Sequence, residues 1–269
     1  MGLDSECDGW FWDTEVMFRA ALAGLRIHEM PVLFLRRDDK ESTVRVLRDS
    51  WQYLVRLWEF RARVGLTLLD RSPVFWSTVG YDLTMQAIHG GRRKLRQTMA
   101  EVAELIEPGS SVTDVCCGSA SLYRDFLRER GCRYLGLDYN GRFILAARNR
   151  GIPARLFDLR REDPPVSDYV VMTMSCFHFH DQEREVLAKL KRAARRAVIV
   201  AESVRNLAQL PIVGPLANWL ARPGAGEYRY RYDPDSFRRF AEAGAASRFI
   251  HRPGDRTAIA VFDTAPGCP

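Results

Sequence analysis

Apolar and polar positions in the larger, C-terminal part of the chain follow a pattern that predicts alternating strands and helices. Short apolar runs rich in β-branched residues predict buried strands, and apolar residues spaced three or four apart predict helices. The expected strands are 111–116, 133–138, 154–157, 168–174, 197–202, 247–251 and 257–262. The expected helices are 82–106, 122–130, 142–150, 182–194 and 234–243.

Alternation of this kind favours a parallel sheet that is covered by helices on both faces. We therefore expect an α/β fold with a Rossmann-like, seven-stranded, mostly parallel sheet. The last two strands, 247–251 and 257–262, have no helix between them and predict a C-terminal antiparallel pair. Ligands of such sheets bind beyond the carboxyl ends of the strands, where the strand order reverses.

The N-terminal part follows a different, mainly helical pattern. Residues 44–64 carry apolar side chains at helical spacing, with Trp51 and Trp58 on one face and several arginines beside them. Tryptophan flanked by arginine suits a helix that lies in a membrane interface, and packing of both tryptophans on another domain is the alternative. We expect a helical extension over 1–63, a linker over 64–80 and one main domain over 81–265.

Size and composition fit this division. A chain of 269 residues, 46% hydrophobic and 28% charged, is typical of a soluble protein with one main domain and an appendage. No apolar run reaches the length of a membrane span, and the acidic first residues do not resemble a signal peptide. The expected location is cytoplasmic, with peripheral membrane contact through 44–64 as an additional expectation.

Charge and cysteine content argue against two classes of site, a nucleic-acid site and a metal site. The net charge of +6 comes mostly from arginines scattered among acidic residues, which indicates a solvated surface more than a nucleic-acid site. The six cysteines include no C-x-x-C pair, so we expect no metal site and a reduced, intracellular setting.

Small and acidic residues follow the first three predicted strands. After the first come Gly118, Ser119 and Ala120, small residues that let the backbone approach a ligand at a helix N-terminus. After the second comes Asp138, about twenty residues beyond that turn, where a carboxylate can accept both ribose hydroxyls. After the third, Asp158 is placed where an adenine ring would lie.

The fourth strand and an insertion complete this edge of the sheet. Ser175 and His178 follow the fourth strand and face the middle of the same predicted cleft. A histidine there suits a general base, with His180 and Asp181 as alternates and a strand-capping role for His178 as the rival interpretation. Residues 204–232 are rich in proline, glycine and aromatics, and predict a lid or acceptor wall or, alternatively, an ordinary surface loop.

These residues resemble the class I S-adenosylmethionine-dependent methyltransferases over about residues 74–263. The family motif Asp-x-Gly-x-Gly-x-Gly corresponds here to Asp114-Val115-Cys116-Cys117-Gly118-Ser119-Ala120, with the outer glycines replaced by Cys116 and Ala120. The resemblance implies that S-adenosyl-L-methionine is the cofactor, with Asp114 and Gly118 beside its methionine part, Asp138 on the ribose and Asp158 on the adenine amine. The full set of expected cofactor residues is Asp114, Cys116, Gly118, Ser119, Ala120, Asp138, Tyr139, Asp158, Leu159 and Ser175.

A second resemblance concerns residues 9–63. The run Gly9-Trp10-Phe11-Trp12-Asp13-Thr14-Glu15-Val16 is similar to the C-terminal end of family 2 glycosyltransferases that use polyprenyl-phosphate acceptors. The donor-binding half of that family has no counterpart here, so glycosyl transfer by this chain is not expected. Together the two resemblances imply a methyltransferase for a small-molecule, glycolipid or isoprenoid-type acceptor.

Three alternatives stay open. A methyltransferase-fold module fused to a glycosyltransferase, with weak cofactor binding and no turnover, is suggested by the replaced glycines. An RNA methyltransferase is suggested by the arginine excess, although Ser175-Cys176-Phe177-His178 stands where base-modifying enzymes often carry Asn-Pro-Pro-Tyr. A nicotinamide-dependent oxidoreductase shares the fold, but no Tyr-x-x-x-Lys pair occurs in the chain.

Overall fold

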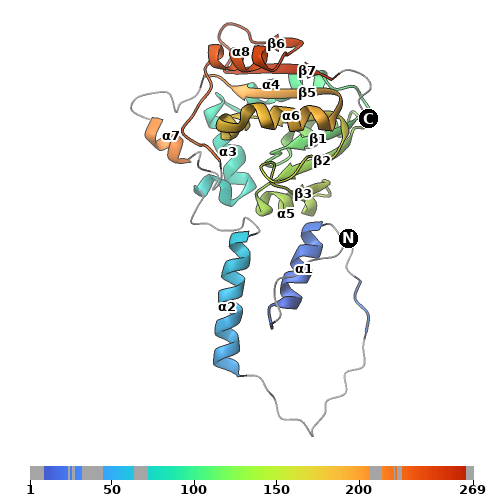
Figure 1. Ribbon diagram of the computed structural model, residues 1–269, viewed down its shortest axis with the longest axis vertical. Coiled ribbons are helices and arrows are strands. Elements are labelled where there is room, and N and C mark those ends of the chain that lie inside the picture. The colour runs from blue at the N-terminus through green and yellow to red at the C-terminus, as the bar shows by residue number, and fades with distance from the viewer. Residues whose placement is uncertain are drawn as a thin grey trace. The chain divides into compact units, whose positions relative to one another are not determined.

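The computed structural model describes residues 9–23, 25, 28–31, 45–63, 72–205, 214–220, 222 and 226–264. The chain divides into two compact units, residues 1–66 and 67–269 (Figure 1). Of the expected linker over 64–80, residues 64–71 lie outside the described part. Residues Pro73–Trp76 form a 3₁₀ helix, η1, and the first helix of the second unit begins at Thr78.

The first unit is a pair of helices, α1 (Trp12–Ala23) and α2 (Val46–Arg63). Phe60 of α2 is buried and packs edge-on against Phe11 and Phe18, with both pairs of ring centroids 5.5 Å apart. The Thr14 hydroxyl and the Tyr53 hydroxyl are hydrogen-bonded at 2.9 Å. The unit therefore has a small aromatic core of its own, which the sequence did not predict.

The second unit contains a seven-stranded sheet of order β3-β2-β1-β4-β5-β7-β6 (Figure 1). Its strands are β1 (Ser111–Val115), β2 (Arg133–Asp138), β3 (Ala154–Leu156), β4 (Ser167–Thr173), β5 (Ala194–Ser203), β6 (Arg248–Ile250) and β7 (Thr257–Asp263). Strand β7 pairs antiparallel with both β5 and β6, and the other pairings are parallel. The predicted Rossmann-like fold with a closing antiparallel pair is confirmed.

Helices cover the sheet. They are α3 (Thr78–Ile88), α4 (Arg92–Glu104), the π-helix η2 (Tyr123–Leu127), α5 (Gly141–Asn149), the 3₁₀ helix η3 (Cys176–Gln182), α6 (Glu183–Ala193), α7 (Gly214–Leu220) and α8 (Pro234–Ala243). The single helix expected over 82–106 is wrong, because Gly90 and Gly91 break it with φ values of 83° and 104°. Helices α6 and α8 bury Leu190 and Phe237 in the main core against β-strand residues such as Val198.

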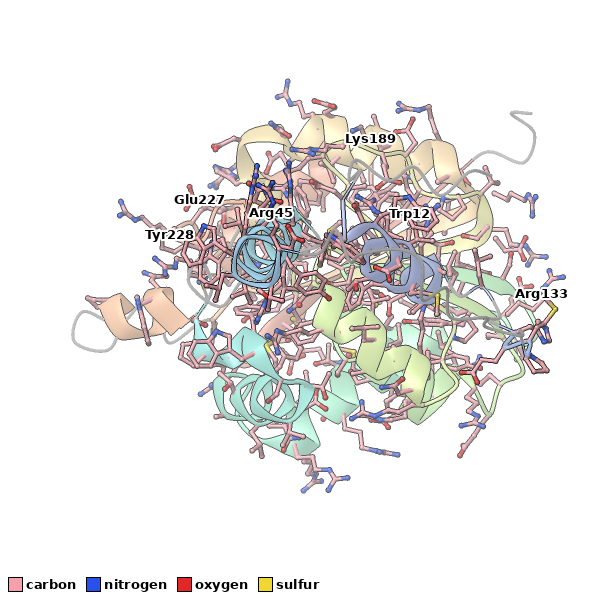
Figure 2. All side chains as sticks on the ribbon, turned by 90° about the horizontal axis from the view of Figure 1, so that it is seen from below. Trp12, Arg45, Arg133, Lys189, Glu227 and Tyr228 are labelled. Carbon is pink, nitrogen blue, oxygen red and sulfur yellow. The ribbon has the colours of Figure 1, made fainter. Side chains whose placement is uncertain are left out.

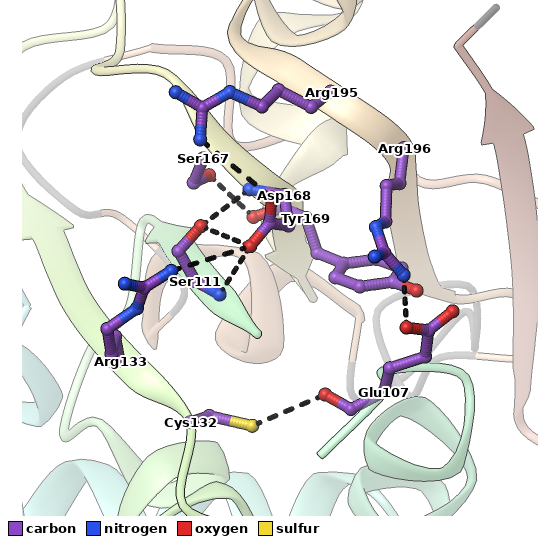
Figure 3. A network of polar contacts seen from close by, with 9 residues as sticks. All are labelled: Glu107, Ser111, Cys132, Arg133, Ser167, Asp168, Tyr169, Arg195 and Arg196. Atoms are coloured by element: carbon purple, nitrogen blue, oxygen red, sulfur yellow. Dashed lines mark hydrogen bonds and ion pairs between the residues drawn. The ribbon is translucent and has the colours of Figure 1, made fainter. Parts of the chain in front are cut away.

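A polar network fixes the amino ends of the central strands (Figure 3). The Asp168 carboxylate accepts hydrogen bonds from the Ser111 backbone N–H at 2.8 Å and the Ser111 hydroxyl at 2.6 Å. The Asp168 N–H donates in return to the Ser111 hydroxyl at 2.8 Å. These bonds hold the pKa of Asp168 below its usual range. The side chain of Arg133, next in the network, extends outward and is 77% exposed (Figures 2 and 3).

Candidate functional site

The carboxyl ends of β1, β2, β4 and β5 border a cavity, beside the point where the strand order reverses between β1 and β4. Helix α3 and the loop that follows α7 provide the other walls. Eight of the predicted site residues line it: Cys116, Gly118, Asp138, Tyr139, Asp158, Leu159, Ser175 and His178. Ser119 lines a second cavity beside α3 and α4, whereas Asp114 and Ala120 are not among the lining residues of either.

The loop after β1 keeps the shape of a glycine-rich turn although two of its glycines are replaced. Cys116, Gly118 and Ala120 all have left-handed backbones, with φ values of 59°, 54° and 55°. A Cβ atom on Gly118 would lie 3.0 Å from the Tyr81 ring, so a larger residue would have to displace that ring. At Cys116 and Ala120 the same conformation costs about 1–2 kcal/mol each, since both carry a Cβ.

Asp138 joins the end of β2 to this loop. Its carboxylate accepts hydrogen bonds from the Gly118 N–H at 2.8 Å and the Asn140 N–H at 2.7 Å. Each carboxylate oxygen has two lone-pair sites, so these bonds leave capacity for further donors. The arrangement places an oriented anionic acceptor in the cavity wall, which fits a pair of ribose hydroxyls.

Asp158 also lines the cavity, but its carboxylate is already engaged. Arg160 donates to it through Nε at 2.8 Å and Nη2 at 2.9 Å, and the same guanidinium lies 5.1 Å from the centroid of the Tyr139 ring. An adenine amine would therefore share the Asp158 oxygens with Arg160.

His178 is held in one tautomer by the loop opposite it. Its Nδ1 donates to the carbonyl oxygen of Glu227, and the Glu227 N–H donates to the His178 carbonyl at 2.9 Å. Because a carbonyl has no proton to give, Nδ1 carries the hydrogen and Nε2 is a hydrogen-bond acceptor. Burial lowers the pKa of His178 to about 4, so the ring is neutral near pH 7.

Glycine is required next to this pair of hydrogen bonds. Gly226 has φ 80°, and a Cβ atom there would lie 2.7 Å from the His178 carbonyl oxygen. Glu227 and Tyr228 follow it on the loop (Figure 2). Of the predicted lid over 204–232, Ala217, Gly226 and Arg231 line the cavity, while residues 206–213, 221 and 223–225 lie outside the described part.

Asp114 lies in the protein interior, away from the cavity lining. It is buried and its carboxylate accepts a hydrogen bond from the Tyr134 hydroxyl at 2.9 Å. Burial raises its pKa to about 7, and the Tyr134 bond offsets part of that rise. Asp114 thus supports the strand that carries the loop.

Several cavity residues were not predicted from the sequence: Tyr81, His89, Glu202, Ser203 and Arg231. Glu202 lies near the carboxyl end of β5, much as Asp138 lies at the end of β2. An acidic residue at the end of a predicted strand was therefore the signal that could have identified Glu202 as a site residue. Its carboxylate accepts from the N–H groups of Ser203 at 2.8 Å and Phe177 at 3.3 Å. Burial raises the pKa of Glu202 to about 7.

Two further properties bear on the site. Within the described ranges, no group of three or more histidine, cysteine or acidic side chains is arranged to hold a metal ion. Among the helices that the structure describes, none is both long and apolar enough to cross a membrane.

Comparison with known proteins gives matches of limited extent. A family model described as methionine biosynthesis protein MetW matches residues 96–206, less than half of the chain. The glycosyltransferase AglD of Haloferax volcanii is 28% identical over 172 residues, which cover 59% of this chain and 26% of that protein. The chain therefore spans about a quarter of the length of this curated relative.

Solved methyltransferases are similar at low identity. Magnesium protoporphyrin IX methyltransferase from Synechocystis PCC 6803, with bound SAH, is 17% identical with a TM-score of 0.49, covering 65% of this chain and 85% of that one. Human N-acetylserotonin methyltransferase, in complex with SAM, is 12% identical with a TM-score of 0.49, covering 82% of this chain and 68% of that one.

Proposed function

We propose that the second unit is an S-adenosylmethionine-dependent methyltransferase that acts on a small-molecule acceptor. The observation that carries this proposal is the junction of Asp138 with the Gly118 turn at the edge of the cavity. That junction puts a fixed carboxylate next to a close-approach backbone, which is what a nucleoside with an attached amino acid requires. Support also comes from the motif resemblance and from the MetW match.

Different cavity residues would bind different parts of such a cofactor. Asp138 would bind the ribose, and the Tyr139 ring with Leu159 would provide apolar surface for the adenine. Gly118 would face the methionine part, with Cys116 and Ser175 nearby. The remaining predicted residues, Asp114, Ser119 and Ala120, would act by shaping the loop.

When bound, the cofactor supplies a methyl group on a sulfonium, which is already a good leaving group. The protein then has to align the acceptor and exclude water, and alignment alone provides effective molarities of about 10⁵ M or more. His178 lines the cavity and its Nε2 carries no proton, which suits a hydrogen bond from an acceptor O–H or N–H. Its low pKa makes it a weak base, so orientation of the acceptor is its main role.

Titration calorimetry with S-adenosylmethionine tests the proposal on the full chain. We expect saturable binding to the wild-type protein and at least a tenfold loss of affinity in Asp138→Ala. Asp163→Ala is the matched control, because Asp163 is 66% exposed and is not among the cavity-lining residues. Absence of binding to a folded wild-type protein would overturn the proposal and favour the non-catalytic module, which the strained backbones of Cys116 and Ala120 also suggest.

We also propose that the acceptor is presented at a membrane surface, as a glycolipid or isoprenoid-type molecule. Support comes from α2, whose Leu47, Trp51 and Trp58 are 88%, 69% and 60% exposed. Sedimentation with phosphatidylglycerol vesicles tests this, and we expect the full chain to pellet with them. Unchanged pelleting after Trp51→Ala and Trp58→Ala together would refute a role for this face.

A further inference from the structure

Arg231 lines the cavity, and it forms no ion pair with an acidic side chain among the described residues. Phe177 after β4 and Glu202 near the end of β5 line the same cavity. Arg231 lies directly over the Phe177 ring, with its guanidinium carbon 4.2 Å from the ring centroid. A charged group is therefore placed in a wall that is otherwise largely apolar.

The guanidinium of Arg231 is held on one side only. Its Nη1 donates to the carbonyl oxygens of Tyr228 at 2.7 Å and Tyr230 at 2.5 Å. Its Nε is buried, and neither Nε nor Nη2 has a hydrogen-bond partner within the described residues. Nε and Nη2 form the edge of a guanidinium that binds two oxygens of one anion side by side.

Neighbouring acids do not neutralise this edge. Glu202 and Glu227 both attract Arg231, but neither forms an ion pair with it in the described structure. The Glu202 oxygens accept backbone N–H groups of Phe177 and Ser203, and Glu227 likewise accepts from the N–H groups of Tyr228 and Arg229. Burial lowers the pKa of Arg231 to about 10, and the attraction of Glu202 and Glu227 offsets only part of that shift.

Two other residues that line the cavity, Ser203 and His89, have buried polar atoms. The Ser203 hydroxyl and Nδ1 of His89 have no hydrogen-bond partner within the described residues. His89 is only 4% exposed. Buried polar groups without partners are costly, so a ligand that bonds to them gains selectivity over one that cannot.

We infer that Arg231 binds an anionic group of the acceptor, a carboxylate or a phosphate monoester, while the apolar wall around Phe177 takes the body of that molecule. The inference rests on the proposed function, since it names the class of molecule that the methyl group reaches. Arg231 is then a specificity-determining residue.

Binding of matched probes to the full chain tests this inference. The probes are 3-phenylpropionate, 2-phenylethyl phosphate and the uncharged 3-phenylpropanamide, each measured by calorimetry with and without S-adenosylhomocysteine. We expect an anionic probe to bind about 10- to 100-fold more tightly than the amide, as a charge-assisted pair of hydrogen bonds requires. Whichever anion binds more tightly identifies the group.

Three variants locate the effect. Arg231→Gln should remove the preference for the anion, and Arg231→Lys should retain part of it because the charge stays while the paired donors are lost. Arg229→Gln should leave it unchanged, since Arg229 is exposed on the same loop. Circular dichroism checks that each variant folds.

The outcomes separate this inference from the proposed function. If neither the carboxylate nor the phosphate probe binds the wild-type protein more tightly than the amide, the inference is overturned, whatever the variants do. A preference for the anion that survives Arg231→Gln in a folded protein overturns it as well. Binding of S-adenosylmethionine without anion preference leaves the proposed function standing alone, and anion preference without cofactor binding leaves only the anion site.

Discussion

Gly118 shows at the scale of one residue why the loop after β1 tolerates some replacements and not others. Cys116 and Ala120 take the same left-handed backbone as Gly118, so their side chains are accommodated at a cost of strain. Gly118 faces the Tyr81 ring, and there a side chain would collide as well. The sequence indicated that the middle glycine is kept, and the structure supplies the reason.

Gly118→Ala should therefore reduce both stability and cofactor binding. We expect a loss of about 2–4 kcal/mol in the free energy of unfolding, from left-handed strain together with displacement of Tyr81. Gly131→Ala is the control, because Gly131 also has a positive φ of 67° but has nothing within 4 Å of its Cβ position. Urea denaturation measures the free energy of unfolding of both variants. Equal losses of stability in the two would show that the Tyr81 contact is unimportant.

Individual site residues were predictable only where the chain signals them locally. Asp138 ends the apolar strand β2, His178 lies in the short helix after β4, and both line the cavity. Arg231 belongs to an irregular loop, and its neighbours Phe177 and Glu202 come from two separate strand ends. No pattern within one segment of the sequence predicts that these three side chains come together, because their proximity depends on the tertiary structure.

At the scale of elements, the amino ends of β1 and β4 are joined by the Asp168–Ser111 network (Figure 3). The carboxylate accepts two hydrogen bonds from one residue of the adjacent strand, so it fixes the parallel register at the start of the pairing. This end of the sheet lies opposite the cavity end of the same strands, and it contributes to stability more than to binding.

Asp168→Asn should destabilise the fold by about 1–3 kcal/mol at pH 7, because a charged acceptor is lost. The bonds to Ser111 lower the pKa of Asp168 in the folded state, so its contribution is present above the unfolded pKa of about 3.9. It is lost as pH falls through the lower, folded value. Urea denaturation of both proteins should give a stability gap that narrows as pH drops below about 4.

Asp163→Asn is the control for that measurement, since its surface pair with Arg192 is largely exposed. A gap between Asp168→Asn and the wild-type protein that stays constant from pH 7 down to about 3 would contradict an ionised role for Asp168.

Element boundaries followed from the sequence where apolar runs are unambiguous. The seven strands lie close to the predicted ranges because each is a short buried run between turn residues. The helix expected over 82–106 failed because the apolar spacing continues through Gly90 and Gly91, where the backbone reverses. The spacing of apolar residues indicates which residues are buried. It does not reveal a break in a helix when the buried face continues on both sides of the break.

At the scale of the whole molecule, the chain consists of two compact units with separate cores. The aromatic core of the helix pair contains Phe11, Phe18 and Phe60, whereas the sheet unit has its own main cluster around residues such as Val198 and Phe237. Among the described residues, those that line the cavity all belong to the second unit. We expect cofactor binding to be a property of that unit alone.

Phe60→Ala should loosen the helix pair without changing affinity for S-adenosylmethionine. Loss of a buried phenylalanine costs about 3–5 kcal/mol, which exceeds what a two-helix core can supply. Amide hydrogen exchange should become faster in α1 and α2 and stay unchanged in β1 and β4. Trp58→Ala, at a 60% exposed position, is the control, and a change in cofactor affinity beyond about twofold in Phe60→Ala would contradict independence.

The two outer strands of the sheet, β3 and β6, are only three residues long, and their central or first positions carry Arg155 and Arg248. A sheet edge that is long, flat and apolar recruits strands from other molecules and seeds aggregates. Here each edge exposes few unpaired backbone groups and places a positive charge beside them. At high protein concentration, as during overexpression, the edges of the described sheet therefore offer few backbone groups to which a strand of another molecule could bind.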